Sequence, residues 1–376
     1  MPPRLIVIGA GPIGIAAAVE AAERKYDVTM LEAGEPGDSL RKWGSTRFFS
    51  PFAMNVTPRM RAMLNGANHR DDALLTGPEF IDQVLQPIAA RLNVLTSHRV
   101  LAIGRRGLTR EDYAGHPLRS ERAFRLIAET PEGEKTFEAE IVLDATGGLR
   151  LPRAIGAGGL PATGESRIPS LLIRSLGALE RIPLGGKRVM VIGNGHSAAN
   201  AIAFLAGADA QVVWAVRTAN ARPCEEVAND PLPERKRIVS IANDLAQTPP
   251  PWLRVLRRAM VERIDDRNGG IQVGLTGGRR VEADFIAAFT GYRPDASILT
   301  ELEVEISPVT EGGARLQRAI ANVTDCLNVP AVRAQDLESG ESNFYFIGSR
   351  AYGRARSFLL RTGLQQLQTI FEGLPR

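Results

Sequence analysis

The chain has 376 residues, of which 44% are hydrophobic and 23% are charged, a composition typical of a soluble globular protein with two or three domains. The formal net charge is +4, and no run of lysine and arginine exceeds three residues, so nothing indicates a nucleic-acid-binding segment. Glycine and proline at positions 9–14 interrupt the first apolar stretch. We therefore expect neither a signal peptide nor a membrane span.

The opening of the chain has the pattern of a dinucleotide-binding unit. Residues 5–8 form an uncharged apolar run, which is typical of a strand buried on both faces. Gly-Ala-Gly-Pro-Ile-Gly follows at 9–14, then an Ala-rich helix over 15–22. A second strand at 28–31 ends in Glu32. Strand, glycine turn, helix, strand and acid are thus in the order that such a unit requires.

Each part of this unit has a physical role. Gly9 permits the tight turn, Gly11 lets the backbone approach a pyrophosphate, and Gly14 lets the helix and strand pack closely. The N–H groups of the helix start face the phosphates, and Glu32 is placed to accept hydrogen bonds from a ribose. A glycine-rich turn without a ligand is the alternative. The residues predicted at this site are Gly9, Gly11, Pro12, Ile13, Gly14 and Glu32.

The chain then predicts loops, one helix and a small sheet. Residues 33–39 are a loop by composition, and residues 40–58 mix aromatic and polar side chains without a clear period. That segment is either a well-packed loop or the lining of a site for a flat aromatic ligand. A helix is predicted over 77–91. Strands at 94–103, 124–128, 135–140 and 141–144 fit a β-meander between two segments of parallel sheet.

The opening pattern recurs after a linker at 149–170 that is rich in Gly, Pro and Ala. A strand at 188–192 precedes Gly-Asn-Gly-His-Ser-Ala-Ala and a helix, and the next strand, at 211–216, ends in Arg217 instead of an acid. An arginine there suits a 2′-phosphate, which favours NADPH over NADH. A surface arginine is the alternative. The residues predicted at this second site are Gly193, Asn194, Gly195, His196, Ser197 and Arg217.

The remaining elements are less regular. Residues 218–253 hold many prolines and charges, with a helix near 234–246, and are interpreted as an excursion from the core fold. Strands are predicted at 271–275, 281–289 and 343–348, and an amphipathic helix is predicted at 357–371.

On these units the sequence resembles, over nearly its whole length, the two-dinucleotide-binding-domain flavoproteins. That superfamily includes thioredoxin-reductase-like enzymes and the flavin-containing and N-hydroxylating monooxygenases. The resemblance implies an α/β fold with two Rossmann-like domains, for FAD and NADPH, and a discontinuous FAD domain that carries the small β-meander. It places the first part of the FAD domain at 1–150, the NAD(P)H domain at 151–290 and the rest of the FAD domain at 291–376.

The resemblance also assigns cofactor contacts. The first glycine unit, with Glu32, matches the FAD site, and the second matches the NADPH site. Asp-Ala-Thr-Gly at 144–147 and Phe-Thr-Gly-Tyr at 289–292 match the paired chain crossings between the domains. The further cofactor-binding residues that it implies are Trp43, Val100, Ala145, Thr146, Gly147, Thr290, Gly291, Tyr292, Gly348, Ser349, Phe358 and Leu359.

Three departures from the superfamily motifs narrow the function. The last strand ends in Gly348-Ser349 where many members have Gly-Asp, so a serine hydroxyl or a backbone N–H replaces that aspartate. Residues 154–159 lack the C-x-x-C of thioredoxin-reductase-like enzymes, which argues against a dithiol relay to the flavin. Residues 171–182 lack the histidine and aromatic residue of the flavin-containing monooxygenase fingerprint.

Candidate catalytic residues come from the two segments that the resemblance places at the flavin, 40–58 and 349–363. Trp43 and Phe48 are expected either to wall the flavin or to pack in the core. The catalytic candidates are Trp43, Arg47, Asn55, Tyr352 and Arg354.

Other polar groups near these segments have two interpretations each. Arg47, Arg354 and Arg356 suit an anionic substrate or reduced flavin, or else a solvated surface. His196 is expected to contact the NADPH pyrophosphate or to steer protons, or else only to shape the helix start near a phosphate. Cys224 is either a reactive thiol or an inert buried one.

Cysteine and histidine usage excludes several site types. The only cysteines are Cys224 and Cys326, and no C-x-x-C occurs, so neither a redox dithiol pair of that kind nor a zinc site is predicted. No other metal site is predicted either. Both cysteines are expected to be reduced thiols in a cytoplasmic protein.

The sequence thus predicts an NADPH-dependent FAD oxidoreductase. We favour a flavin monooxygenase that oxygenates nitrogen, sulfur or carbon of a small molecule through a C4a-(hydro)peroxyflavin. The alternative is a reductase or electron-transfer flavoprotein that passes electrons to a disulfide, quinone or protein partner without a C-x-x-C relay. A non-enzymatic redox sensor is a third hypothesis. The expected partner is a small-molecule substrate, with no nucleic acid and no membrane span, and a homodimer is left open.

Overall fold

The structure is a computed structural model that describes residues 2–64, 69–267, 270–323 and 326–374. It contains two five-stranded sheets. The strands of the first are Arg4–Ile8 (β1), Asp27–Leu31 (β2), Val94–Leu95 (β3), Ile141–Asp144 (β7) and Phe344–Phe346 (β18). The strands of the second are Leu172–Ile173 (β9), Lys187–Ile192 (β10), Ala210–Ala215 (β11), Leu253–Leu256 (β12) and Phe285–Ala288 (β16).

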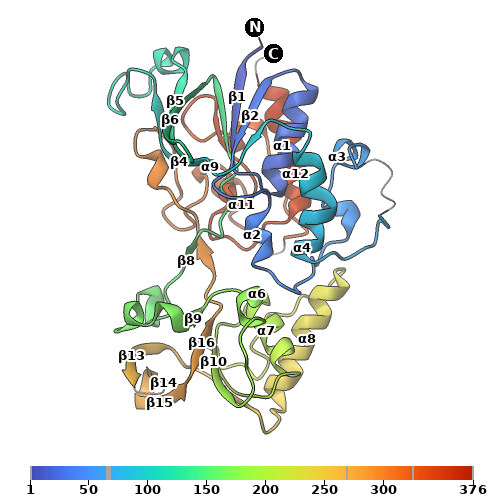
Figure 1. Ribbon diagram of the computed structural model, residues 1–376, viewed down its shortest axis with the longest axis vertical. Coiled ribbons are helices and arrows are strands. Elements are labelled where there is room, and N and C mark those ends of the chain that lie inside the picture. Colours follow the sequence, from blue (N-terminus) through green and yellow to red (C-terminus); the bar gives the residue numbers. More distant parts are fainter. Residues whose placement is uncertain (1, 65–68, 268–269, 324–325, 375–376) are drawn as a thin grey trace.

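The two sheets are built on one plan. Their strand orders are β18-β7-β1-β2-β3 and β9-β16-β10-β11-β12, and every neighbouring pair is parallel. β1 and β10 occupy the same central place, each followed by a glycine turn and a helix. Figure 1 shows the first sheet with its helices above the second. The repeated sequence pattern is therefore a repeated structural unit, and the predicted fold class is confirmed.

The helices cover the sheets. In the upper part α1 packs against α12, and in the lower part α7 packs against α8 (Figure 1). No helix among the described residues is long and apolar enough to span a membrane. The helices are Pro12–Glu23 (α1), Asp38–Arg41 (α2), Pro58–Ala62 (α3), Gly77–Phe80 (α4), Gln86–Ala89 (α5), Leu176–Leu179 (α6), His196–Leu205 (α7), Pro233–Gln247 (α8), Ala314–Ala319 (α9), Ala334–Leu337 (α10), Ser349–Tyr352 (α11) and Leu360–Gly373 (α12).

Three smaller sheets complete the fold. The predicted meander is an antiparallel sheet of Arg99–Arg105 (β4), Phe124–Thr130 (β5) and Gly133–Ala139 (β6). A second antiparallel sheet joins Val261–Arg267 (β13), Gly270–Leu275 (β14) and Arg279–Ala283 (β15). Leu151–Pro152 (β8) pairs with Tyr292–Arg293 (β17). This last pair connects the upper and lower parts in Figure 1, beside the domain boundaries that we propose.

Four predictions about single elements are wrong. The strand expected at 94–103 is two strands, because β3 joins the first parallel sheet and β4 belongs to the meander. Residues 218–253 belong to the core, because α8 packs on α7 and Ile238, Val239 and Ala242 are buried in the same cluster. The exposed charges of α8, on Lys236, Arg237 and Asp244, conceal this apolar stripe in the composition, whereas Glu234 and Arg235 are themselves buried. The strand expected at 281–289 is two strands, β15 and β16, separated by Asp284. The helix expected from 357 begins only at Leu360.

Candidate active site between two dinucleotide units

The first glycine turn packs tightly against the chain crossing at the end of β7. Gly9 has a φ of +98°, and a Cβ there would lie 2.8 Å from the carbonyl oxygen of Ala145. A Cβ on Gly14 would collide with the carbonyl oxygen of Gly9. Only glycine fits these two positions, because one needs a left-handed backbone and the other a close approach of helix to strand.

The second glycine turn repeats this arrangement. Gly193 has a φ of +117°, and a Cβ there would collide with the carbonyl oxygen of Phe289, which lies at the other predicted crossing. The Asn194 side chain donates to the carbonyl of Pro223 at 2.8 Å. Each glycine turn is therefore held against the crossing that the resemblance paired with it.

The middle glycine of each turn is open to a ligand. A Cβ on Gly11 or on Gly195 would meet no atom within 4 Å. Helices α1 and α7 begin directly after these glycines, and neither helix start has a capping side chain. Uncapped first-turn N–H groups beside an open glycine fit a pyrophosphate. The residues present thus fit a dinucleotide at both turns.

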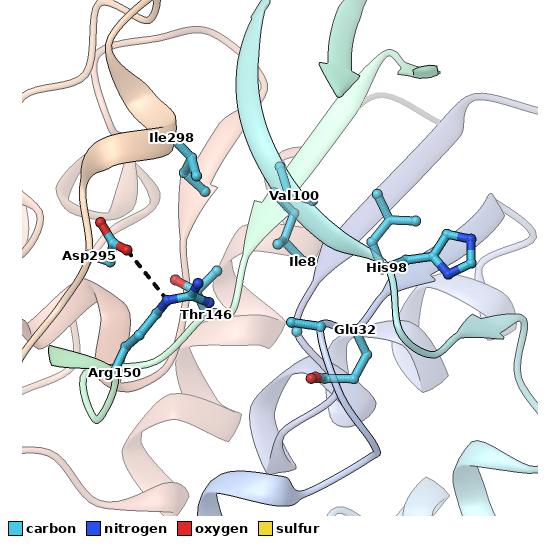
Figure 2. Close-up of a pocket in the computed structure, with 11 residues that line it drawn as sticks. Ile8, Glu32, His98, Val100, Thr146, Arg150, Asp295 and Ile298 are labelled. Atoms are coloured by element: carbon cyan, nitrogen blue, oxygen red, sulfur yellow. Dashed lines mark ion pairs between the residues drawn. The ribbon is translucent and has the colours of Figure 1, made fainter. Parts of the chain in front are cut away.

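A cavity lies at the carboxyl ends of β1 and β2 (Figure 2). It brings together four residues predicted from the sequence, namely Gly9, Glu32, Val100 and Thr146. It also contains polar residues that the sequence analysis missed, namely His98, Arg150 and Asp295. Arg150 and Asp295 form an ion pair at 3.4 Å on one side of it, opposite Glu32 in Figure 2. Because Arg150 and Asp295 are far apart in the sequence, no local motif indicated that they would form one wall of this cavity.

The carboxylate of Glu32 is fixed by the turn that it faces. One oxygen accepts from the backbone N–H of Ala10 at 2.6 Å, and the other accepts from the N–H of Gly34 at 2.9 Å. Each oxygen keeps a further lone pair for a donor such as a ribose hydroxyl. The backbone thus orients the acid in the manner expected of a ribose-binding residue.

The Gly348-Ser349 departure has a structural counterpart. The Ser349 hydroxyl accepts from the N–H of Gly148 at 3.1 Å, so this residue bonds to the first crossing. The next residue, Arg350, pairs with Asp144 at 3.0 Å, and both side chains are fully buried. The Thr146 hydroxyl donates to the other Asp144 oxygen at 2.6 Å. The serine and the arginine thus hold the crossing in place.

The candidates of segment 40–58 are mostly engaged within their own domain. Trp43 packs on Phe48 with ring centroids 4.9 Å apart. Asn55 is buried and its amide donates to the carbonyl of Ser50 at 3.0 Å. The guanidinium of Arg47 donates to the carbonyl of Leu74 at 2.6 Å and pairs with Glu79 at 3.7 Å. These contacts fix the shape of the loop.

The candidates of segment 349–363 differ in exposure. Tyr352 is fully buried, and burial raises the pKa of its phenol to about 12. Its ring packs on Phe358 with centroids 5.2 Å apart, and its hydroxyl accepts from Gln366 at 2.8 Å. Arg354 remains partly exposed and lies 3.7 Å from Glu311. Tyr352 is therefore placed to support Phe358, whereas Arg354 is accessible to a ligand.

The residues of the second crossing join it to the linker. The Thr290 hydroxyl donates to the carbonyl of Arg153 at 2.8 Å, and the Tyr292 hydroxyl donates to the carbonyl of Arg174 at 2.7 Å. Arg174 in turn pairs with Glu165 at 2.9 Å. The polar side chains of this crossing thus fix the path of the chain between the two parts.

The two parts meet along a seam that includes the second glycine turn. The ring of His196 lies edge-on to Phe49 of the 40–58 loop, with centroids 5.0 Å apart. Glu180 accepts from the N–H of Ser45 at 3.1 Å and also from its hydroxyl. The N–H of Gly177 donates to the carbonyl of Lys42 at 3.1 Å. The contacts place His196, predicted at the NADPH site, beside the loop predicted at the flavin.

Positive charge gathers at this seam. Burial lowers the pKa of Arg153, and the nearby Arg354, Arg217 and Arg356 lower it further. These four guanidiniums come from the linker, the end of β11 and the segment after α11. Such a group suits anionic ligands. Arg153 was missed because nothing in the linker sequence distinguishes it from a surface arginine.

The surroundings of the histidine of the second turn favour its neutral form. Burial lowers the pKa of His196, and the charges of Arg235 and Arg356 lower it further. Its ring thus shares the seam with cations without adding a positive charge. Its neighbours Arg235 and Glu225 lie in the region that the sequence analysis set aside as an excursion, which explains why they were not predicted.

The two cysteines have different surroundings. Burial, with a smaller effect of Glu226, raises the pKa of the Cys224 thiol to about 12. This thiol therefore stays protonated at neutral pH, as an inert buried cysteine does. Cys326 is half-buried, and its sulfur accepts from the guanidinium of Arg235 at 3.1 Å across the seam.

Comparisons with known proteins agree with this geometry. The fold is similar to that of bacillithiol disulfide reductase from Bacillus cereus, with a TM-score of 0.71 and 18% identity over 99% of this chain and 98% of that one. It is similar to an ornithine N-hydroxylase from Kutzneria sp. 744, with a TM-score of 0.67 and 16% identity over 99% and 98%. It is also similar to thioredoxin reductase from T. acidophilum, with a TM-score of 0.64 and 15% identity over 98% of each chain. No curated protein sequence matches the chain.

The sequence itself matches a family. Residues 3–314 match the profile of the pyridine nucleotide-disulphide oxidoreductases. This match and the shared fold confirm the predicted superfamily and the predicted cofactors, FAD and NADP(H). The chain therefore belongs to the pyridine nucleotide-disulphide oxidoreductase family and is an FAD-dependent oxidoreductase.

Proposed function

We propose that this protein uses NADPH and FAD to oxygenate a small molecule. The observation that carries the proposal is the contact of His196 with Phe49, which brings the second glycine turn against the loop predicted at the flavin. Neither thiol lies in segment 154–159, where thioredoxin-reductase-like enzymes carry their C-x-x-C. Cys224 is buried in the core of the lower part, and Cys326 contacts Arg235. Electrons from NADPH then have no protein disulfide to pass through.

The residues of the chain have distinct tasks in this proposal. Glu32 accepts hydrogen bonds from the ribose hydroxyls of FAD, and the lack of a side chain at Gly11 leaves room for its pyrophosphate. Arg217 and Arg153 neutralise the phosphates of NADPH. Bound FAD supplies the transfer of electrons from the nicotinamide to the final acceptor. The Phe49 and His196 rings join the two parts at the seam.

The test uses FAD-loaded protein and NADPH under isotopically labelled dioxygen. Oxygenation predicts that label enters an amine, thioether or ketone substrate of a test panel, with NADPH consumed in equal amount. Label that appears only in hydrogen peroxide and water, for every compound of a broad panel, would count against the proposal. A heat-treated sample and a sample without NADPH are the controls.

A second candidate is a reductase, and the Cys326 contact favours it. A guanidinium 3.1 Å from a sulfur stabilises the thiolate form, and this thiol lies at the seam. The similar fold of bacillithiol disulfide reductase belongs to a protein with such an activity. Under this alternative, NADPH oxidation without oxygen is fast with a low-molecular-weight disulfide or a quinone. Cys326→Ser then abolishes turnover with the disulfide, whereas Cys224→Ser does not.

A further inference from the structure

A second cavity, of about 460 Å³, lies in the C-terminal part of the chain, away from the Glu32 cavity. One wall is segment 307–310 together with α9 and the residues after it, as far as Val323. The other wall is segment 355–357, which connects α11 to α12. Figure 1 shows α9 and α11 close together in the upper part. The lining includes Arg356, one of the arginines that the sequence suggested for an anionic substrate or reduced flavin.

The lining combines an apolar body with a positive rim. Two guanidiniums, Arg318 and Arg356, belong to the lining, and no carboxylate does among the residues that the structure describes. The apolar side chains are Pro308, Val309, Ala314, Ile320, Ala321, Val323 and Ala355, and the neutral polar ones are Ser307, Thr310, Gln317 and Ser357. Such a lining is complementary to a molecule with an apolar body and a negative head group.

Arg356 is available to a ligand. Its present partner, Glu225, lies 3.9 Å away, and the two side chains are 76% and 78% exposed. An exposed pair at that distance contributes little stability, so a carboxylate in the cavity displaces Glu225 at small cost. Arg318 is held more closely, by Glu305 at 3.1 Å, and it is 68% exposed. Arg356 is therefore the main candidate for the head group.

The cavity adjoins the flavin side of the molecule through its second wall. In α11, which precedes segment 355–357, Ser349 bonds to Gly148 of the first crossing. In the first turn of α12, which follows the segment, a Cβ on Gly363 would lie 2.8 Å from Ile13 of the first glycine turn. The wall is thus attached at both ends to the FAD-binding unit. Its pair with Glu225 also brings it to the seam with the lower part.

We propose that this cavity is the substrate pocket and that the substrate is an amphipathic carboxylate. The apolar residues of the cavity hold its hydrocarbon body, and the Arg356 guanidinium binds its carboxylate with assistance from Arg318. The proposal rests on the function proposed above, because it names the substrate class of that reaction.

The test is calorimetric titration of the FAD-loaded full chain with octanoate, octylamine and octanol as probes. Octanoate binds, and octylamine and octanol bind at least tenfold more weakly. Arg356→Gln weakens octanoate binding by about tenfold or more, which is the usual effect of removing a charge-assisted hydrogen bond. Arg125→Gln, an exposed arginine on β5 outside the cavity, leaves it unchanged. Ala321→Trp fills the cavity and removes octanoate binding.

Two results would overturn the pocket: equal octanoate affinity in the wild type and Arg356→Gln, or octylamine binding as tight as octanoate. Bound FAD, measured by its absorbance, shows whether Ala321→Trp is folded. If Ala321→Trp does not fold, Arg356→Gln still tests the pocket, because the Arg356 side chain is exposed and its replacement leaves the fold intact. NADPH oxidation is measured on the same preparations without probe. Failure of that reaction contradicts the proposed function but not the pocket, whereas normal NADPH oxidation without octanoate binding contradicts the pocket alone.

Discussion

The carboxylate of Asp144 and the guanidinium of Arg350 form an ion pair at 3.0 Å, and neither side chain has any exposure to solvent. Arg350 also donates to the carbonyl of Glu311 at 3.0 Å and lies over the ring of Phe346. The pair joins the end of β7 to α11, two segments 206 residues apart in the chain. It therefore holds together the two pieces of the upper part.

Replacing Arg350 by methionine is expected to destabilise the protein strongly. Arg350→Met leaves the Asp144 carboxylate buried without its cation, which lowers the free energy of unfolding by about 3–5 kcal/mol. Arg106→Met is the control, because that arginine is 67% exposed and its pair with Glu138 is at 3.5 Å. Urea denaturation followed by circular dichroism measures both. Equal losses in the two variants would show that the buried pair has no special role.

Replacing Arg217 by glutamine is expected to change coenzyme preference. Loss of a charge-assisted contact to a 2′-phosphate raises KM for NADPH by about tenfold to a hundredfold, with kcat and the KM for NADH nearly unchanged. Steady-state kinetics with an artificial electron acceptor measure this. Arg280→Gln, another exposed arginine of the lower part, is the control. An equal rise in KM for both coenzymes would contradict a 2′-phosphate contact.

Replacing Glu32 by alanine is expected to reduce FAD retention. The variant loses the acceptor for the ribose and both hydrogen bonds that hold the turn, to Ala10 and Gly34. We expect FAD affinity to fall by about tenfold or more. The ratio of FAD to protein after dialysis, with a fluorescence titration of apoprotein, measures it. Glu35→Ala, an exposed neighbour, retains FAD as the wild type does.

The stability of the protein is expected to depend on pH through His196. Because the folded pKa of His196 is lowered by burial and by Arg235 and Arg356, the unfolded chain binds a proton there more readily. This contribution to stability is complete above the unfolded pKa of about 6.5 and is lost as pH falls toward the lowered folded pKa. His196→Gln removes the loss. Denaturation at pH 5.5 and 7.5 measures the difference, and identical pH slopes in both proteins would refute it.

The two thiols are expected to react at very different rates. Cys224 is buried with a thiol pKa of about 12, whereas Cys326 is half-buried beside Arg235. Iodoacetamide at pH 8 therefore alkylates Cys326 in the folded protein and Cys224 only after denaturation. Peptide mass spectrometry after timed quenching distinguishes them. Early labelling of Cys224 would show that the lower core opens more readily than its burial implies.

Local patterns predicted the two dinucleotide units well. Gly9, Gly14 and Gly193 occupy positions where short-range geometry excludes other residues. The requirement of each turn for glycine is therefore visible in a short stretch of sequence. The roles of Asn55 and Tyr352 were harder to predict. Both are polar residues in segments predicted to lie near the flavin, yet the Asn55 amide bonds to Ser50 and the Tyr352 hydroxyl bonds to Gln366 inside the protein.

The rest of the site depends on contacts between distant segments. His98, Arg150 and Asp295 line the Glu32 cavity from three separate parts of the chain, and no local periodicity brings such residues together. The same holds for Arg153, whose neighbours come from the end of β11 and from the segment after α11. The error at 218–253 has another cause, because the many charged residues of α8, two of them buried, outweighed its apolar stripe in the composition.

The separation of the hydrophobic residues into independent cores has a consequence for how the protein unfolds. The cluster around β1 contains residues up to Leu143 and from Leu299 onward, and the clusters around β10 contain residues from Ile155 to Phe289. With FAD and NADP(H) at the glycine turns predicted for them, each coenzyme protects a different core. Heating should produce two transitions, of which FAD raises the temperature of one and NADP⁺ that of the other. The two transition temperatures of one protein would thus measure separately whether each of its two coenzyme sites is occupied.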